Sequence, residues 1–174
     1  MLRNEVVLVD IDDNELGVEN KTVAHNKPML HRAFSIYLYN DKKQMLVQRR
    51  ALSKYHTPGL WSNACCSHPC KGEDIKKSAI DRLIDEVGIK TNIYEIFSFI
   101  YMYKFREDLY EYEYDHVFIG EYNGEVILND EEVCDSKWMD LDELKKDLMD
   151  NPLKYTPWFI ISAPRVIEYI KNKK

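Results

Sequence analysis

The chain of 174 residues lacks a hydrophobic run that could cross a membrane, since none approaches the ~18 apolar residues that a spanning helix needs. It also lacks internal repeats, low-complexity tracts and linkers rich in proline, glycine or serine. We therefore expect one domain over residues 1–174. The apolar run at the N-terminus is too short and too acidic for a signal peptide, so the expected location is cytoplasmic.

Positive charge is in deficit, because 24 Lys and Arg face 30 Asp and Glu, for a net charge of −6. This deficit argues against nucleic acid as the main partner. The cations are nevertheless clustered: Arg49, Arg50 and Lys54 lie within six positions. Such a patch on an acidic protein fits either a small anionic ligand or a solvated basic loop.

Cysteine is sparse, and without a secretory signal we expect the four thiols to be reduced. Cys66 and Cys70 have a spacing seen in some zinc knuckles, but no second cysteine pair accompanies them. The pattern therefore does not support a structural zinc knuckle.

Apolar alternation and turn residues predict strands at residues 6–10, 34–39, 45–49, 61–64, 94–103 and 110–118. The second and third of these strands are expected to form a hairpin. Asn123-Gly124, between residues 119–122 and 125–128, predicts another hairpin.

Residues 73–87 carry apolar side chains every four positions and precede Gly88, which predicts a helix with a glycine cap. Asp140 and Glu143 form a capping box for a second helix over residues 141–149. Thr156-Pro157 predicts the start of a last helix, which Pro164 should kink or split. The predicted fold class is α+β, with mixed and antiparallel sheets and flanking helices.

Three acidic residues, Glu111, Glu113 and Asp115, share one face of the strand at 110–118, and tyrosines take the other. Like charges on one face repel one another, so that face either lies in water or binds a cation. Alternation alone slightly favours exposure to water.

The histidines of the sequence favour the alternative in which this acidic face binds a cation. Two or three imidazoles together with a carboxylate pair could close around one divalent ion, and a mixed set of N and O donors favours Mn²⁺ or Mg²⁺ over Zn²⁺. The candidates are His25, His31 and His68, with His56 and His116 less clearly placed. Each histidine alone is more often a surface or hydrogen-bonded residue.

The turn around Cys65-Cys66-Ser67-His68 places a thiol two residues before an imidazole, which can activate it. The alternative is that both cysteines pack as small apolar residues. Alternation buries one and exposes the other, and spacing does not decide which is functional. Arg82 and Glu86, four apart in the helix, form either a surface ion pair or a site for Mg²⁺ and a phosphate.

The helix and the preceding turn resemble a degenerate Nudix box. Gly88, Glu86, Leu83, Glu73 and Ile89 fit the pattern, Ser67 replaces the first glycine, Asp81-Arg82 replaces the Arg-Glu pair, and Asp85 stands for one glutamate. Loss of the Arg-Glu pair, which supplies much of the hydrolytic metal site in Nudix hydrolases, puts hydrolysis in doubt.

From Lys21 to Trp158 the chain resembles type I isopentenyl diphosphate isomerases, which have a Nudix-like fold. The motifs that carry the resemblance are His31-Arg-Ala-Phe34, Gln48-Arg-Arg-Ala-Leu-Ser-Lys54, Pro58-Gly-Leu-Trp-Ser-Asn63, Cys66-Ser-His-Pro69, Glu111-Tyr-Glu113, Asn129-Asp-Glu-Glu-Val133 and Pro157-Trp158. Their joint occurrence in this order is highly specific.

The resemblance implies a metal site of His25, His31, His68, Glu111 and Glu113, holding Mn²⁺, Mg²⁺ or Zn²⁺. It implies catalytic roles for Cys66, Glu113, Tyr101 and Trp158, and diphosphate contacts from Lys21, Arg50, Lys54 and Arg82. Glu86 is implied to bridge to the diphosphate through a further Mg²⁺. The implied partner is a small isoprenoid diphosphate, with no nucleic acid or membrane partner, and the protein is expected to be a monomer or weak homodimer.

The implied reaction converts isopentenyl diphosphate to dimethylallyl diphosphate through a carbocation-like species. It needs an acid on one side of the alkene, a base on the other and little water. We expect the Glu113 side, with Tyr101, to deliver the proton. A Nudix hydrolase of a nucleoside diphosphate derivative explains the fold but leaves Cys66 unused, and a non-enzymatic metal-binding module does not explain the basic patch.

Overall fold

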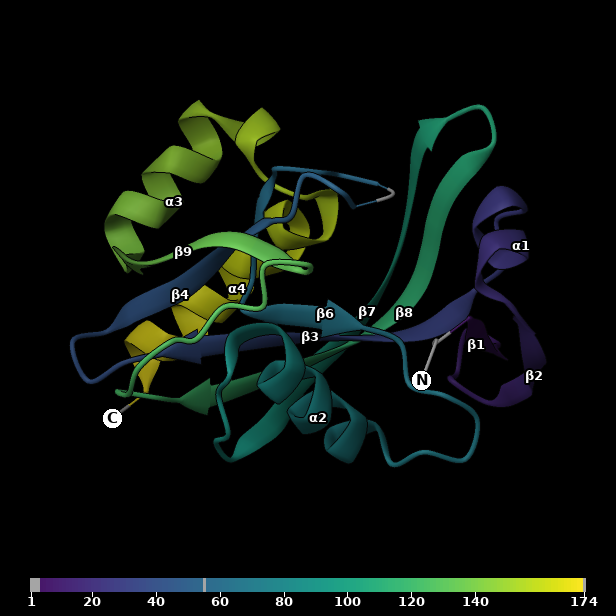
Figure 1. Ribbon diagram of the computed structural model, residues 1–174, viewed down its shortest axis with the longest axis horizontal. Coiled ribbons are helices and arrows are strands. Elements are labelled where there is room, and N and C mark those ends of the chain that lie inside the picture. Colours follow the sequence, from purple (N-terminus) through teal and green to yellow (C-terminus); the bar gives the residue numbers. More distant parts are fainter. Residues whose placement is uncertain (1–3, 55, 174) are drawn as a thin grey trace.

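A computed structural model describes residues 4–54 and 56–173 of the protein. Its strands are β1 (Glu5–Val9), β2 (Glu15–Asn20), β3 (His31–Tyr39), β4 (Gln44–Arg50), β5 (Trp61–Ser62), β6 (Cys65–Ser67), β7 (Ile93–Arg106), β8 (Leu109–Glu121) and β9 (Val133–Asp140). Its helices are α1 (Lys21–Asn26), α2 (Ile75–Val87), α3 (Leu141–Asp150) and α4 (Pro157–Asn172), with a 3₁₀ turn over Pro152–Lys154. The mixed sheet with flanking helices confirms the predicted α+β class (Figure 1).

Strand β3 is the centre of the sheet and sets the positions of the functional residues. It pairs with β8 in parallel over nine residue pairs, from His31 opposite Glu113 to Tyr39 opposite Glu121. It pairs with β6 antiparallel, with Ser35 opposite Cys66. Cys66 and Glu113 therefore enter the fold on strands that both border β3.

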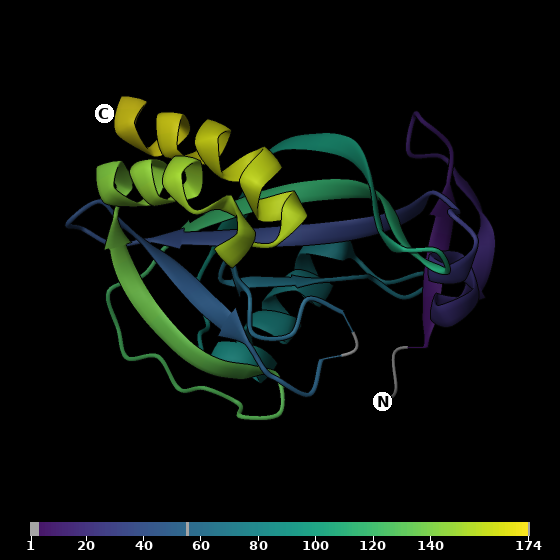
Figure 2. The same cartoon turned by 90° about the horizontal axis from the view of Figure 1, so that it is seen from above.

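Two apolar clusters cover the two faces of the sheet, with α3 and α4 on one side and α2 on the other (Figure 2). Residues of β3 alternate between them: Phe34, Ile36 and Leu38 pack towards α2, and Tyr37 and Tyr39 towards α4. Because both faces are covered, the run from Ala33 to Tyr39 in β3 is apolar except at Ser35, as expected of a buried strand.

Helix α2 forms as predicted, and its two ends explain its length. Asp74 is the N-cap and accepts a hydrogen bond from the Lys77 amide at 2.7 Å. Gly88 ends the helix with φ of +68°, a conformation that glycine adopts without steric cost. A Cβ at this position would lie 2.9 Å from the Ile127 Cβ, so the close approach also requires glycine.

The two predicted hairpins differ from the structure. Strands β3 and β4 are joined by a short turn, but only Tyr39 and Met45 are in register, because β6 pairs with β3 and β9 with β4. The prediction of a hairpin at Asn123-Gly124 is wrong, since β8 ends at Glu121 and residues 125–128 form no strand.

The backbone of the segment after Gly124 bonds to the end of α2 instead of to β8. The Ile127 amide donates to the Val87 carbonyl, and the Asn129 amide donates to the Glu86 carbonyl, both at 3.0 Å. These bonds satisfy the exposed carbonyls of the helix end, and they remove the donors that a returning strand would need.

The C-terminal helices largely follow the prediction. Asp140 caps α3, accepting from the Asp142 and Glu143 amides at 2.8 and 3.2 Å. Helix α4 starts at Pro157 as expected, but it continues through Pro164 and is not split. The Thr156 side chain makes no cap; its hydroxyl contacts the Ser62 hydroxyl at 2.9 Å and ties the helix start to β5.

Four elements, β2, α1, β6 and β9, have no predicted counterpart. Among the described residues, no helix is long and apolar enough to cross a membrane.

Candidate active site

One cavity brings together nearly all of the residues that the sequence singled out. It measures about 500 Å³ including its open mouth, and β6, β7, β8, α2 and the start of α4 contribute side chains. All the predicted site residues line it except His25 and His31. The lining residues are Lys21, Phe34, Ser35, Arg50, Lys54, His56, Cys66, Ser67, His68, Arg82, Glu86, Tyr101, Glu111, Glu113 and Trp158.

Four buried residues gather at one end of this cavity, and each offers a metal-ligating atom within 4.8 Å of the others: His25, His31, His68 and Glu113. They come from α1, β3, the residue after β6, and β8. The His68 Nε2 lies 3.3 Å from the His31 Nε2 and 2.8 Å from the Glu113 Oε1. We call these four residues the cation group.

The protonation states in the cation group suit a metal ion. Burial lowers the pKa of His25 to about 2 and that of His68 to about 4, so both imidazoles are neutral near pH 7. Burial opposes ionisation of Glu113, but the neighbouring imidazoles of His31 and His68 hold its pKa well below the usual range. Neutral imidazoles and a carboxylate are the forms that bind metal.

The donor set also fits a cation in its geometry. The His31 Nδ1 lies 2.8 Å from the Met29 carbonyl oxygen, and donation to that oxygen leaves Nε2 with a free lone pair turned towards His68 and Glu113. Opposite ligands of one divalent ion lie about 4–5 Å apart, which matches the spread of these atoms. The cation group can therefore hold a divalent metal.

Glu111, predicted as a fifth ligand, is not part of the cation group. One of its oxygens contacts the His56 Nε2, and the other accepts a hydrogen bond from the Tyr101 hydroxyl at 2.8 Å. The same hydroxyl lies 2.7 Å from the Glu113 Oε2. The assignment of Glu111 as a metal ligand stays a prediction.

The acidic face of β8 is buried, so the slight preference for exposure to water is wrong. Glu111, Glu113 and Asp115 are 3%, 7% and 1% exposed. Histidines and Tyr101 compensate the first two, while burial beside Glu113 raises the pKa of Asp115 well above its usual range. Asp115 accepts a hydrogen bond from the Ser35 hydroxyl at 2.7 Å.

The two adjacent cysteines occupy different environments, as strand alternation predicts. Cys65 is fully buried in the apolar cluster under α2, and Cys66 faces the cavity. Burial raises the pKa of the Cys66 thiol, Glu86 and Glu113 add to this, and Arg50 opposes it. All four cysteines are free thiols, as expected.

The opposite end of the cavity carries cations that are paired with carboxylates. Lys54 forms an ion pair with Glu132, and Arg82 pairs with Glu86 and lies 3.4 Å from Glu132. Glu86 is 4% exposed and also accepts from the Gln48 amide at 3.1 Å. We call Lys54, Arg82, Glu86 and Glu132 the anion end. If a phosphate replaced the two carboxylates as the partner of Lys54 and Arg82, both cations would be available to bind it.

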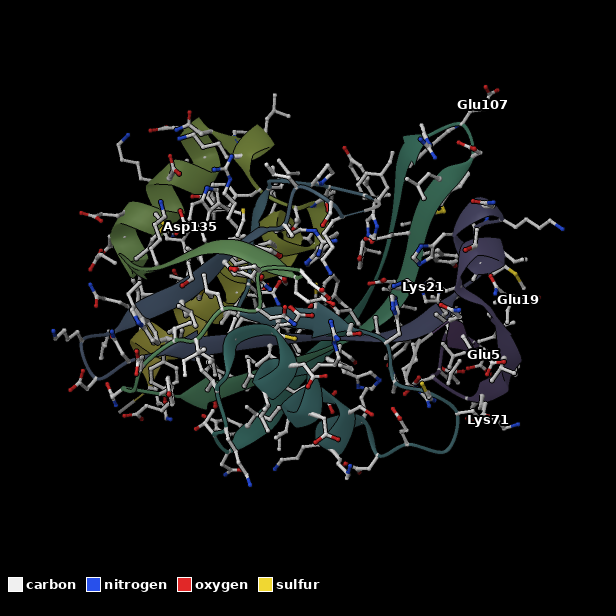
Figure 3. The ribbon with its side chains drawn as sticks, viewed as in Figure 1. Glu5, Glu19, Lys21, Lys71, Glu107 and Asp135 are labelled. Atoms are coloured by element: carbon white, nitrogen blue, oxygen red, sulfur yellow. The ribbon has the colours of Figure 1, made fainter. Side chains whose placement is uncertain are left out.

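Two further cations border the cavity. Lys21 begins α1 on the side towards β8 (Figure 3), and burial lowers its pKa while Glu113 and Glu111 act in the opposite direction. The Arg50 guanidinium lies 5.5 Å from the centre of the Trp158 ring. The indole N–H of Trp158 lies 3.0 Å from the Ser62 hydroxyl and 3.1 Å from the Asn63 side-chain oxygen, so the ring is held in place.

Glu132 and His56 are two residues of the site whose place the sequence patterns do not reveal. Glu132 lay within a recognised motif, but only the fold brings it to Lys54 and Arg82. His56 has no clear place in the sequence patterns, because its separation of 55 residues from Glu111 leaves no local signal.

Comparison with known proteins identifies the family of the chain. Residues 29–159 match the model of the NUDIX domain. Isopentenyl-diphosphate Delta-isomerase 2 of Photorhabdus laumondii is 46% identical over 154 residues, covering 88% of this chain and 87% of the relative. Isopentenyl-diphosphate Delta-isomerase 2 of Aromatoleum aromaticum is 43% identical over 166 residues, covering 95% and 88%.

A solved structure supports the fold alone. DR0079 from Deinococcus radiodurans superposes with a TM-score of 0.69 at 18% identity, over 84% of this chain and 90% of that one. The identities to the curated relatives, which extend over most of both sequences, settle the family: the chain belongs to the isopentenyl-diphosphate Delta-isomerases and carries a NUDIX domain.

Proposed function

We propose that the protein converts isopentenyl diphosphate to dimethylallyl diphosphate, with Cys66 and Glu113 as the proton carriers on two sides of the substrate. Family membership supports the reaction. The observation that supports the residues is that Cys66, on β6, and Glu113, on β8, line one cavity from the two strands that border β3. An alkene held between them would have a proton carrier on each side.

The proton on the Glu113 side comes from a short network. The Tyr101 hydroxyl is within hydrogen-bond reach of both Glu111 and Glu113, so when this carboxyl pair carries a proton the hydroxyl can relay one to the alkene and take the pair's proton in return. Cys66 takes up the other proton in its thiolate form, which Arg50 stabilises against the burial that raises the pKa of the thiol. The reverse reaction uses the same groups in opposite roles.

A divalent ion in the cation group would supply positive charge that fixes the Glu113 carboxylate and moderates its basicity. We propose Mn²⁺, Mg²⁺ or Zn²⁺ as this ion, because imidazole and carboxylate donors suit all three. The residues His25, His31, His68 and Glu113 would hold it.

Trp158 protects the electron-deficient intermediate. Its ring is buried and fixed by hydrogen bonds, and a desolvated cation over an indole face gains about 2 kcal/mol. The ring offers electron density without a nucleophilic atom, so it stabilises the cation without trapping it. The enclosing side chains keep water away from the same carbons.

The diphosphate takes no part in the proton transfers and serves as an anchor. Lys21, Arg50, Lys54 and Arg82 border the cavity and supply the positive charge for it. We propose that a Mg²⁺ ion carried in with the substrate reaches Glu86. Binding energy from this remote group orients the five-carbon end between the proton carriers.

Turnover in deuterated water tests the proposal. The protein is incubated with isopentenyl diphosphate and Mg²⁺, and the products are followed by NMR. Formation of dimethylallyl diphosphate that carries deuterium supports the isomerase. Release of phosphate from this substrate or from nucleoside diphosphate derivatives, without isomerisation, contradicts it and favours a Nudix hydrolase.

Three finer features stand as proposals alongside the reaction. We propose that the protein works in the cytoplasm, as a monomer or weak homodimer, and without a nucleic-acid or membrane partner. Sedimentation over a range of protein concentrations tests the oligomeric state. A monomer or weak dimer gives the monomer mass at low concentration, whereas a stable dimer would keep the dimer mass at every concentration and contradict the proposal.

A further inference from the structure

His56 is a cavity residue for which the proposed reaction has no role. Its side chain is 10% exposed, and its Nε2 contacts the Oε1 of Glu111. Its ring lies 5.5 Å from that of Phe105 in an edge-on arrangement, and 6.2 Å from that of Trp158. The imidazole is therefore held by packing on one side and directed at a carboxylate on the other.

The backbone of His56 is fixed independently of its ring. The Arg50 Nη2 donates to the His56 carbonyl at 3.2 Å. The next residue, Thr57, has a φ of +50°, which is uncommon for a residue with a branched side chain. A change of the His56 ring thus leaves the contact between Arg50 and the backbone in place.

The need for His56 follows from the few hydrogen-bond donors at Glu111, which contacts Tyr101 and His56, whereas Glu113 also contacts His68. Glu111 and Glu113 lie on the same face of β8, two residues apart, and the Tyr101 hydroxyl is within 2.8 Å of both. A hydroxyl carries one proton and cannot donate fully to two carboxylates at once. Without a second donor, Glu111 would compete with Glu113 for the proton of Tyr101.

We propose that His56 is a positioning residue that donates to Glu111 and thereby leaves the Tyr101 hydroxyl hydrogen-bonded to Glu113 rather than shared with Glu111. It also holds Glu111 in a defined orientation beside the cation group, as hydrogen bonds to carboxylates around metal sites commonly do. His56 acts through Glu111 and does not touch the reacting carbons. This inference rests on the proposed function, since it assigns Tyr101 and Glu113 their roles in the isomerisation.

Two substitutions separate the hydrogen bond from the packing. His56→Phe keeps an aromatic ring against Phe105 and removes the donor. His56→Gln places an amide N–H near the position of the imidazole Nε2. Phe105→Leu is the matched control, because it alters the packing around His56 and leaves the contact with Glu111.

Each variant is measured in two ways, by steady-state isomerisation and by calorimetric titration of the metal-free protein with Mn²⁺. For His56→Phe we expect a loss of about 10- to 100-fold in kcat and in Mn²⁺ affinity, the range typical of a lost hydrogen bond behind a metal site. KM should stay close to that of the unchanged protein, because Arg50 keeps its backbone contact. His56→Gln should recover most of both losses, and Phe105→Leu should show neither.

Unchanged kcat and Mn²⁺ affinity in His56→Phe would overturn the inference. So would a His56→Gln variant that loses as much as His56→Phe while both unfold at the same temperature as the parent protein. If the parent protein shows no isomerisation, the proposed function fails. The Mn²⁺ titrations of the same variants then still decide whether His56 positions Glu111.

Discussion

The two ends of the active-site cavity are built on different principles. At the cation group, three histidines and Glu113 already hold their ligating atoms within 4.8 Å of one another, on α1, β3, β8 and the residue after β6. At the anion end, Lys54 and Arg82 are neutralised by Glu132 and Glu86, so a phosphate must displace carboxylates to reach them. One end is preorganised, and the other exchanges its partners on binding.

This difference separates chemistry from binding. A preorganised group needs no rearrangement during the reaction, so a substitution within the cation group should lower kcat. At the end that exchanges ion pairs, the net binding energy is the difference between the contacts of the cations with the phosphate and their contacts with the carboxylates. A substitution there should therefore change KM. The following four substitutions test that division, from the largest expected effect to the smallest.

Glu113→Gln breaks the preorganised end most severely, because it removes a proton carrier and a metal-ligating charge together. We expect kcat to fall by at least about 100-fold, since general acid–base catalysis contributes on the order of 10²–10⁴. Isomerisation followed by NMR measures it. Glu107→Gln, at the exposed tip of the β7–β8 hairpin (Figure 3), is the control. A Glu113→Gln variant with normal kcat would remove Glu113 from the mechanism.

Cys66→Ala should nearly abolish turnover, again on the order of 10²-fold or more, because it removes the proton carrier on the other side. Cys65→Ala is a matched substitution one residue away. It deletes a buried sulfur under α2 and should lower the thermal stability while turnover persists. The reverse pattern, with activity lost only in Cys65→Ala, would show that the functional thiol had been misassigned.

Lys54→Met tests the anion end. A hydrogen bond to a charged group is worth about 1.5–3 kcal/mol, so we expect KM for the substrate to rise roughly tenfold or more while kcat stays similar. Lys42→Met, at an exposed lysine in the β3–β4 turn, should change neither parameter. A fall in kcat without a change in KM would contradict the division between the two ends.

Glu132→Gln sharpens the comparison, because it should act in the opposite direction. Releasing Lys54 and Arg82 from this partly exposed partner removes a competitor of the phosphate. Ion pairs near the surface are worth about 0–1 kcal/mol, so KM should fall by only about twofold. A higher KM in the same steady-state assay would mean that Glu132 holds the two cations in place for the substrate.

Local patterns predicted the parts of the fold that depend on short stretches of chain. The period of α2, its cap at Gly88, the shared face of Glu111 and Glu113, and the different environments of Cys65 and Cys66 all follow from residues close in sequence. The site roles came from the family resemblance, because spacing alone left each motif with an ordinary structural explanation.

The rest depends on partners that are distant in sequence. The acidic face of β8 is buried because His56, His68 and Tyr101 reach it from other elements, and no pattern within the strand reveals them. The parallel pairing of β3 with β8 is likewise invisible locally. The Asn123-Gly124 signal misled because its strand partner was missing: the following backbone bonds to α2.

The segment from Tyr122 to Glu132 has no regular structure, yet its backbone is attached at several points along its length. Ile127 and Asn129 are bonded to the last turn of α2, Ile127 closes over Gly88, and Asn129 accepts from the Val133 amide through its carbonyl. The number of residues between these attachments therefore determines where Glu132 meets Lys54 and Arg82. Insertions and deletions, which surface loops usually absorb, would here move a carboxylate of the substrate site.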